Sequence, residues 1–298
     1  MITNTTDARM SEVTATSVPA REARLSAEEL AAFWRDGYIA TPTLSPEDEL
    51  RAIRATYDQL FAQRTGEREG QMFDTLGHND GKAQEMLLPQ MFTLSRHAPW
   101  LRESALQRNL LAIARQILGP ETELVAEFAI LKPPGRNAPT PWHQDEAFFD
   151  FRTPYDECVS AWVALQEAGA EHGCMQYVPG SNHGPLLTHR SPDGDTKKHG
   201  LEVVGADLSK AVAAPLHAGQ ASVHHCRTLH GAGANLTREA RRGYTLVYAV
   251  PRSRLWLRRS PPWNRGRWTP RDEAELRALP MLRRIKGQIR KAMVKLGV

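Results

Sequence analysis

The middle of the chain, from about residue 121 to 251, constrains the fold more than any other stretch, because short apolar runs alternate there with turn residues. The runs cover 124–131, 158–165, 175–178, 221–225 and 244–250. Their lengths, and the Gly and Pro residues between them, are typical of β-strands. Few long helical patterns separate the runs, whereas parallel strands need a long crossover, usually a helix. We therefore predict a mainly-β barrel of two antiparallel sheets with an N-terminal helical layer.

Three helices are predicted before the strands. Ser26 and Glu29 have the spacing of a capping box, and Gly37 can end the helix that they begin. A second helix is predicted to start at Ser45, because the proline that follows suits the first helical position. A third is predicted over about 106–118, where apolar residues recur at helical spacing. These helices are expected to pack on a sheet.

We predict a disordered tail over 1–24 and a single domain over 25–298. The tail is rich in Thr, Ser and Ala and lacks the apolar core of a secretion signal. Inside the domain, a barrel core over about 121–251 precedes a basic extension over 252–298. The polar segment 65–87 is predicted to be a long loop, and both a lid over the site and a disordered connector remain open.

The basic extension contains 14 Lys and Arg against 3 Asp and Glu, so it accounts for the positive charge of the chain. It is predicted to end in an amphipathic helix over about 280–295. Three interpretations stay open: a solvated helix whose apolar stripe packs on the barrel, a docking surface for an acidic partner such as an acyl carrier protein or the phosphates of a CoA-linked substrate, and contact with nucleic acid or a membrane surface.

The three cysteines, Cys158, Cys174 and Cys226, are widely spaced and form no CxxC pair. An odd, scattered set argues against a disulfide framework or a zinc finger and favours small buried residues in a reducing compartment. No apolar run approaches the ~18 residues that a membrane-spanning helix needs. We therefore predict a cytoplasmic protein without a membrane span.

Two histidines and one aspartate have the chemistry of a metal site. In an extended segment, His143 and Asp145 point to the same side, so imidazole and carboxylate can converge on one ion. His230, from a distant strand, would complete a set of two histidines and one carboxylate, which leaves adjacent coordination positions open. Arg241, at the start of the next apolar strand, could pair in bidentate fashion with the far carboxylate of a chelating diacid.

The order and spacing of several motifs resemble the phytanoyl-CoA dioxygenase family of Fe(II)/2-oxoglutarate oxygenases. The resemblance runs from about residue 26 to 250. The segments that carry it are Asp36-Gly37-Tyr38, Ile130-Leu131-Lys132-Pro133-Pro134, Trp142-His143-Gln144-Asp145, Ala161-Trp162-Val163-Ala164, Gly173-Cys174-Met175, Val178-Pro179-Gly180-Ser181 and His230 through Arg241.

The resemblance implies a fold, a set of cofactors and roles for individual residues. The implied fold is a double-stranded β-helix, and the implied iron ligands are His143, Asp145 and His230. Arg241 matches the arginine that pairs with the side-chain carboxylate of 2-oxoglutarate, while Lys132 and Trp162 match positions that line the cosubstrate pocket. The implied cofactor is Fe(II), with 2-oxoglutarate and O2 as cosubstrates.

Other residues have more than one interpretation. His224 and His225 are rival ligands to His230, and for His225 a supporting or structural place is favoured. Arg242 is the alternative to Arg241, and Asn235 is expected to stabilise a turn. Contact with substrate or packing in the core both remain open for Trp142, Phe148, Phe149, Gln71, Met72, Phe73, Gln90 and Gln176.

The expected function is hydroxylation of an unactivated carbon in a small or lipid-like substrate, with release of succinate and CO2. Relatives that halogenate replace the carboxylate ligand with a small residue, so Asp145 argues for hydroxylation or a related oxidation. The same iron chemistry with a different outcome, namely desaturation, cyclisation or epimerisation, is the alternative. A non-catalytic metal-binding module that acts through its basic tail is a further alternative, which the motif set disfavours.

Overall fold

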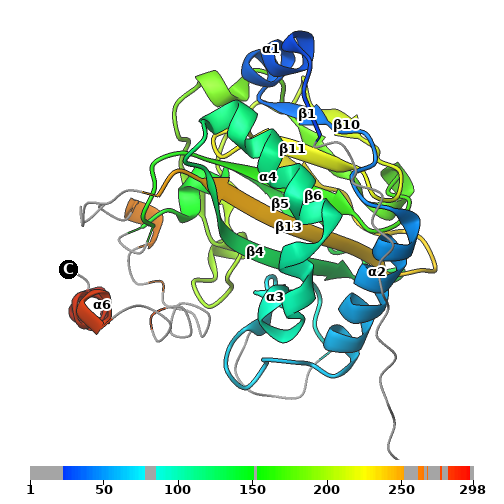
Figure 1. Ribbon diagram of the computed structural model, residues 1–298. Coiled ribbons are helices and arrows are strands. Elements are labelled where there is room, and N and C mark those ends of the chain that lie inside the picture. The colour runs from blue at the N-terminus through cyan, green and yellow to red at the C-terminus, as the bar shows by residue number, and fades with distance from the viewer. Residues whose placement is uncertain are drawn as a thin grey trace, which may run out of the picture.

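Figure 1 shows the computed structural model of the protein. The structure describes residues 23–77, 85–150, 153–251, 261–264, 267, 276 and 281–295. The predicted N-terminal tail therefore lies outside the described residues, apart from its last two positions.

Two antiparallel sheets make up the centre of the molecule. The strands are β1 (Tyr38–Ala40), β2 (Met72–Asp74), β3 (Pro89–Phe92), β4 (Glu123–Lys132), β5 (Thr140–His143), β6 (Cys158–Ala164), β7 (Met175–Tyr177), β8 (His189–Arg190), β9 (Glu202–Val203), β10 (Val212–Ala214), β11 (Ala221–His225), β12 (His230–Ala232) and β13 (Arg241–Ala249). The major sheet has seven strands in the order β1-β11-β6-β13-β4-β3-β2, and the minor sheet has four in the order β10-β7-β12-β5. Strands β8 and β9 form a separate ribbon. This jelly-roll arrangement confirms the predicted double-stranded β-helix.

Helices cover one face of the major sheet. They are α1 (Ala27–Asp36), α2 (Glu47–Ala62), α3 (Leu94–His97) and α4 (Ala105–Leu118), and α4 runs across β6 and β13 (Figure 1). The apolar side of α4 has no exposure to solvent at Leu106 and almost none at Leu110, and it joins Leu246 of β13 in the largest cluster of buried apolar residues. The opposite face of the major sheet faces the interior of the barrel, where the candidate metal ligands lie.

The first helix forms as its sequence predicts, whereas the second starts later than expected. The capping box of Ser26 and Glu29 is present at the start of α1, and Gly37 ends the helix with a positive φ of 82°. Helix α2 begins at Glu47, and Ser45 does not cap it: its hydroxyl donates to Glu49 Oε1 at 2.7 Å. Glu49 also accepts the backbone N–H groups of Ala105 and Leu106 at the start of α4, so it joins the two helices.

The polar segment 65–87 is only partly a loop. Strand β2 lies inside it and pairs with β3 at the edge of the major sheet, with Phe73 opposite Gln90. The expectation of an unbroken loop is wrong for these residues, because three residues paired to a neighbouring strand leave no periodic pattern in the sequence. Residues 78–84 lie outside the described part of the chain.

The basic extension ends in helix α6 (Met281–Lys295). Of its expected apolar stripe, Ile285 and Ile289 are 49% and 58% exposed, so these two positions do not pack on the barrel. The side chains of Leu282 and Met293 lie outside the described residues, as do Trp256 and Trp268. No helix in the described part of the chain is long and apolar enough to cross a membrane.

Candidate metal centre and the adjoining pocket

The two candidate histidine ligands lie on neighbouring strands of the minor sheet. Strands β5 and β12 are antiparallel, and their register places His143 directly opposite His230. After β5, Gln144 stays extended, with φ −115° and ψ 132°, and Asp145 begins the short 3-10 helix η2 (Asp145–Phe148). One extended residue between them lets His143 and Asp145 point to the same side, although only His143 belongs to the strand.

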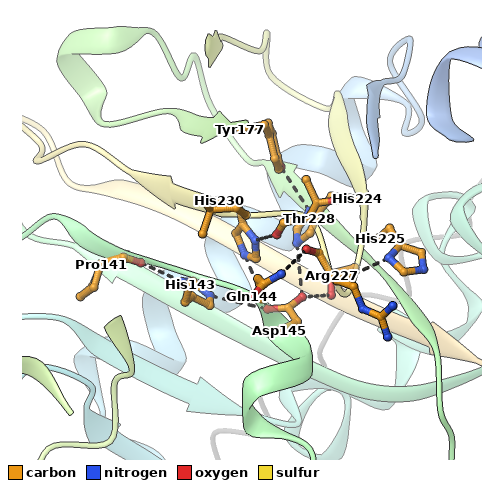
Figure 2. A network of polar contacts seen from close by, with 12 residues as sticks. Pro141, His143, Gln144, Asp145, Tyr177, His224, His225, Arg227, Thr228 and His230 are labelled. Atoms are coloured by element: carbon orange, nitrogen blue, oxygen red, sulfur yellow. Dashed lines mark hydrogen bonds and ion pairs between the residues drawn. The ribbon is translucent and has the colours of Figure 1, made fainter. Parts of the chain in front are cut away.

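The donor atoms of these residues converge on one point, as Figure 2 shows. Asp145 Oδ1 lies 3.6 Å from His143 Nε2 and 3.5 Å from His230 Nε2, and the three candidate ligand atoms are all within 4.8 Å of one another. An ion about 2.1 Å from each of three mutually perpendicular ligands would separate neighbouring ligand atoms by about 3 Å. The observed spacing therefore fits a metal after small rotations of the side chains.

Both imidazole rings are held with Nε2 towards this point. Nδ1 of His143 contacts the carbonyl of Pro141 at 2.7 Å, and Nδ1 of His230 contacts the carbonyl of Thr228 at 2.8 Å. A carbonyl can only accept, so each Nδ1 carries the proton and each Nε2 presents a lone pair. Rings fixed in this way need no tautomer change to bind a metal, which shows that the donor set fits one.

Charge at the centre also suits a cation. Burial alone would raise the pKa of Asp145, but the surrounding His230, His143 and His224 outweigh it and hold that pKa well below its usual value. Burial, followed by the neighbouring imidazoles His143 and His224, lowers the pKa of His230 well below its usual value. At neutral pH this leaves a carboxylate and a neutral imidazole, which are the protonation states that bind metal.

The second oxygen of Asp145 is occupied by the major sheet. Ser160 Oγ donates to Asp145 Oδ2 at 2.6 Å, and His224 Nε2 lies 3.3 Å from the same oxygen. Ser160 of β6 and His224 of β11 are paired in register, so both project from the same face of the sheet. Oδ2 is held in this way, and Oδ1 faces the two candidate ligand histidines.

The rival histidines His224 and His225 face opposite sides of β11. His224 projects into the barrel beside Asp145, and its Nδ1 lies 3.2 Å from the phenolic oxygen of Tyr177 (Figure 2). His225 points the opposite way, and its Nε2 contacts Glu157 Oε1 at 2.6 Å. His225 thus has the structural place that the sequence favoured, and the place beside Asp145 belongs to His224. Adjacent strand residues face opposite sides, and only the pairing with β6 fixes which one faces inward.

Replacing Ser160 with alanine is expected to weaken metal binding by about 10- to 100-fold, which is the usual effect of losing a group that orients a ligand. The reason is that Asp145 Oδ2 loses its hydroxyl donor and the carboxylate can rotate. Calorimetric titration with Mn(II) measures the dissociation constant, and exposed Ser209→Ala is the matched control. Equal Mn(II) affinity in Ser160→Ala and wild type would contradict this role.

Gln144, which lies between the candidate ligands His143 and Asp145, is buried and makes several hydrogen bonds to other parts of the chain. Its backbone N–H donates to His189 Nε2 at 3.1 Å, its amide nitrogen donates to the carbonyl of Arg227 at 2.8 Å, and its Oε1 accepts from Leu187 N at 2.8 Å. Burial lowers the pKa of His189 to about 4, so this imidazole is neutral and can accept. The contacts tie the segment that carries His143 and Asp145 to two loops of the barrel.

A second cluster unites the three residues expected around 2-oxoglutarate. Arg241 is 1% exposed, its guanidinium carbon lies 4.9 Å from the centre of the Trp162 ring, and its strand pairs it with Lys132. Lys132 Nζ donates to the carbonyls of Ala232 and Gly233, just beyond His230 in β12. The cluster is therefore joined directly to the strand of a candidate ligand.

The guanidinium of Arg241 is buried without a carboxylate partner among the described residues. Its Nη1 donates to the carbonyl of Gly173 at 3.2 Å, and its Nε has no hydrogen-bond partner. Burial lowers its pKa to about 10, so it stays charged at neutral pH. Burial and then Arg241 lower the pKa of Lys132 well below its usual value. A buried cation with an unused donor is costly unless an anion joins it.

Two glycines make room for this cluster. At Gly243, a Cβ would lie 2.4 Å from Trp162 Nε1, so the absence of a side chain lets Trp162 lie against the strand. Gly173 has a positive φ of 71°, and a Cβ there would lie 2.3 Å from the carbonyl oxygen of Gly233. Any larger residue at either position would displace Trp162 or the segment after His230.

The remaining sequence candidates separate into two groups. Phe148, Phe149 and Gln90 line a cavity of about 420 Å³ that also contacts His143 and Asp145. The other candidates, Trp142, Gln71, Met72, Phe73 and Gln176, are not among the residues that line it. Arg242 points away and pairs with Asp58 at 2.6 Å. Asn235 donates to the carbonyls of Lys132 and Glu239, which confirms its role in the turn.

Trp263 and Arg267 of the basic extension contact the surroundings of the site, which the sequence did not indicate. In the 3-10 helix η6 (Pro262–Asn264), Trp263 Nε1 donates to the carbonyl of Ala147 at 3.1 Å. Arg267 donates to the carbonyl of Gly200 at 3.3 Å. Ala147 belongs to η2, which begins at Asp145. Trp263 therefore stabilises the short helix that carries the candidate carboxylate ligand.

Comparison with known proteins identifies a family. The family model described as phytanoyl-CoA dioxygenase matches residues 33–243. A probable phytanoyl-CoA dioxygenase of Caenorhabditis elegans is 27% identical over 238 residues, which make up 76% of this chain and 75% of that protein.

Solved structures agree with the sequence comparison. EvdO2 from Micromonospora carbonacea var. aurantiaca, complexed with 2-oxoglutarate, is 33% identical with a TM-score of 0.66, covering 82% of this chain and 98% of that one. SnoK, a non-heme alpha-ketoglutarate-dependent carbocyclase from nogalamycin biosynthesis, is 26% identical with a TM-score of 0.60, covering 76% of this chain and 84% of that one.

Proposed function

Because the chain belongs to the phytanoyl-CoA dioxygenase family of Fe(II)/2-oxoglutarate oxygenases, we propose that it hydroxylates an unactivated carbon of a small organic substrate. In the overall reaction, O2 supplies one oxygen atom to the substrate and one to 2-oxoglutarate, which leaves as succinate and CO2. The observation that carries the proposal is the convergence of His143, Asp145 and His230 through two Nε2 atoms and one carboxylate oxygen.

The chain's own residues would hold the iron and its cosubstrate. Bound to His143, Asp145 and His230, iron supplies the open positions at which 2-oxoglutarate and O2 meet. The carbonyls of Pro141 and Thr228 keep the imidazoles in the metal-binding tautomer. Ser160 would orient Asp145 by donating to Oδ2, beside which His224 Nε2 lies at 3.3 Å, so that Oδ1 is the oxygen presented to the iron.

Arg241 would bind the far carboxylate of 2-oxoglutarate. Its position is fixed by Trp162, which lies against the guanidinium, and by the carbonyl of Gly173. The carboxylate would supply the charge that the buried guanidinium lacks, and the low local dielectric would strengthen the pair. Lys132 pairs with Arg241 across the strands and would hold the end of β12 through the carbonyls of Ala232 and Gly233.

Turnover in the presence of a cell extract tests the proposal. With Fe(II), 2-oxoglutarate and O2, an extract of the native cells should stimulate succinate release, and mass spectrometry should detect a product that has gained one oxygen atom. Boiled protein and omission of Fe(II) are the controls. Failure to release succinate with any extract would favour the non-catalytic metal-binding module instead.

The same experiment separates hydroxylation from its alternatives. Desaturation or cyclisation removes two hydrogen atoms from the substrate, whereas epimerisation leaves its mass unchanged and needs two electrons from an added reductant such as ascorbate. Succinate forms in each case, so the mass of the product separates these outcomes. Cyclisation is kept as a second candidate because one of the similar solved structures is a carbocyclase. The partnership with an acyl carrier protein or a CoA-linked substrate remains a prediction.

A further inference from the structure

We propose that Cys158 and Cys226 form a reversible oxidation site, at which hydrogen peroxide creates a disulfide that weakens the neighbouring metal centre. Formation of the disulfide does not depend on the proposed function, whereas its effect is exerted on the candidate ligand Asp145. The proposal is carried by the pairing of the two cysteines across neighbouring strands, by the cavity that reaches one of them, and by the contacts that join both to the metal centre.

The two cysteines lie opposite each other at one end of the β6–β11 pair. The register places His225 opposite Val159, and the antiparallel pairing continues to the next residues, where Cys226 N donates to the carbonyl of Cys158 at 3.0 Å. Opposed residues of antiparallel strands have Cα atoms about 4.5–5.5 Å apart, and disulfides span Cα distances of about 4.4–6.8 Å. The backbone therefore already has a spacing that a disulfide can bridge.

The two side chains also point to the same face of the sheet. Both are 1% exposed and belong to one apolar cluster with Val247 and Ala249 of β13. A hydrogen bond from the Cys158 thiol is the main cause that lowers the pKa of Cys226, whereas burial, followed by Cys226, raises the pKa of Cys158. The thiols are therefore within reach of each other, and Cys226 is the one that more readily becomes the nucleophilic thiolate.

A cavity brings a small oxidant to this pair. Cys158 lines the cavity of about 420 Å³ that His143 and Asp145 also line. A water molecule occupies about 30 Å³ in the liquid, so the cavity has room for hydrogen peroxide, which has only two heavy atoms. Cys174, the third cysteine, lies before β7 in the other sheet and is not among the lining residues, so it serves as an internal comparison.

The oxidation is balanced with peroxide as the only co-reactant. One sulfur attacks an oxygen of hydrogen peroxide, the O–O bond breaks, and the sulfur becomes a sulfenic acid as the first water leaves. The second sulfur attacks the sulfenic sulfur, the S–S bond forms, and the hydroxyl leaves as the second water. The two thiol protons complete the two water molecules, and the two electrons that the thiols lose reduce the peroxide. Cellular thiols reverse the step by exchange, as is usual for redox-sensing disulfides in a reducing compartment.

The segment that carries Cys226 holds the chain on both sides of Asp145. The carbonyl of Cys226 accepts from Glu146 N at 3.0 Å. The carbonyl of the next residue, Arg227, accepts from Gln144 Nε2 at 2.8 Å. A displacement of Cys226 is therefore transmitted to both neighbours of the candidate carboxylate ligand.

The other cysteine is joined to the same ligand through β6. Cys158 lies two residues before Ser160 and on the same face of the strand, and Ser160 Oγ donates to Asp145 Oδ2 at 2.6 Å. A covalent S–S bond is much shorter than a contact between two thiols, so the ends of β6 and β11 must shift when it forms. Because the interior is closely packed, such a shift also moves the groups that orient Asp145, and metal affinity is expected to fall.

Peptide mass spectrometry of the full chain tests the oxidation. The folded protein is treated with hydrogen peroxide without added iron, its remaining thiols are alkylated, and it is digested with trypsin and an enzyme that cleaves after glutamate. Glu167 and Glu171 lie between Cys158 and Cys174, so the digest separates these two cysteines. We expect a cross-linked pair of peptides that contains Cys158 and Cys226 and disappears on reduction, with Cys174 recovered in alkylated form. Absence of this pair, or a disulfide that contains Cys174, would overturn the proposal.

Calorimetric titration with Mn(II) tests the effect on the metal centre. The cross-linked protein should bind Mn(II) at least about 10-fold more weakly, and treatment with a phosphine reductant, removed before the titration, should restore the affinity. Cys226→Ala cannot form the bond, so peroxide should leave its Mn(II) affinity unchanged. Full Mn(II) affinity in the cross-linked protein, or a loss that reduction does not reverse, would refute the switch. Neither measurement needs turnover, so its failure is distinguishable from failure of the proposed function, which succinate release measures.

Discussion

Replacing Asp145 with alanine is expected to reduce iron-dependent succinate formation by at least about 100-fold. Groups that merely orient a ligand commonly contribute 10- to 100-fold, so loss of the ligand itself should cost no less. The change removes Asp145 Oδ1, which lies 3.6 Å from His143 Nε2 and 3.5 Å from His230 Nε2. Succinate formation at saturating Fe(II) and 2-oxoglutarate, together with Mn(II) affinity, measures the effect.

The neighbouring carboxylate provides the matched control. Glu146 directly follows Asp145 in η2, but it pairs with Arg227 at 2.7 Å and not with the candidate ligands. Glu146→Gln should therefore keep most of the activity. If Asp145→Ala retained activity with an unchanged melting temperature, the carboxylate would not be a metal ligand and the proposed centre would be wrong.

Replacing Arg241 with alanine is expected to raise the KM for 2-oxoglutarate by roughly 100-fold. Removing one partner of a buried charge pair commonly costs about 2–5 kcal/mol, and each 1.4 kcal/mol is a factor of ten. Arg241→Lys keeps the charge but loses the planar fork that matches a carboxylate, so an intermediate KM is expected. Succinate formation as a function of 2-oxoglutarate concentration measures each variant.

Arg242 is the natural comparison for Arg241, because it is adjacent in the sequence and faces the other side of β13. It donates to Asp58 and to Gln166, outside the barrel. Arg242→Ala should leave the 2-oxoglutarate KM within a factor of about 2, since a surface pair contributes little. If the KM for 2-oxoglutarate rose in Arg242→Ala but not in Arg241→Ala, Arg242 would be the residue that binds the cosubstrate and the assignment of Arg241 would be wrong.

Local patterns in the sequence predict most of the regular elements. The strands β4, β6, β7, β11 and β13 lie close to the expected runs, and α1 and α4 follow their helical periodicity. These elements span several residues or have their own caps, so each one carries its own signal. Strands such as β1 and β2 escape prediction, because three residues are too few for periodicity and their pairing partners are distant in the chain.

The parts of the site that the sequence does not predict depend on register and long-range packing. Ser160 looks like any buried strand serine until its pairing with His224 places both beside Asp145. The contact of Trp263 with Ala147 joins positions 116 residues apart, and no local pattern in the sequence predicts it. The residues named by the family resemblance, in contrast, can be identified from the sequence alone, because the resemblance consists of their order and spacing.

The burial of Arg241 and Lys132 has a consequence for the lifetime of the protein in a cell. Without an anion, the folded chain bears the cost of two buried basic groups, whereas the unfolded chain hydrates them. A ligand that binds only the folded state stabilises it, by about 2.7 kcal/mol at a concentration 100 times its dissociation constant. Under the proposed function, that ligand is 2-oxoglutarate. A fall in its concentration would then expose more of the unfolded chain to proteases, so that metabolite supply would govern the abundance of the enzyme as well as its rate.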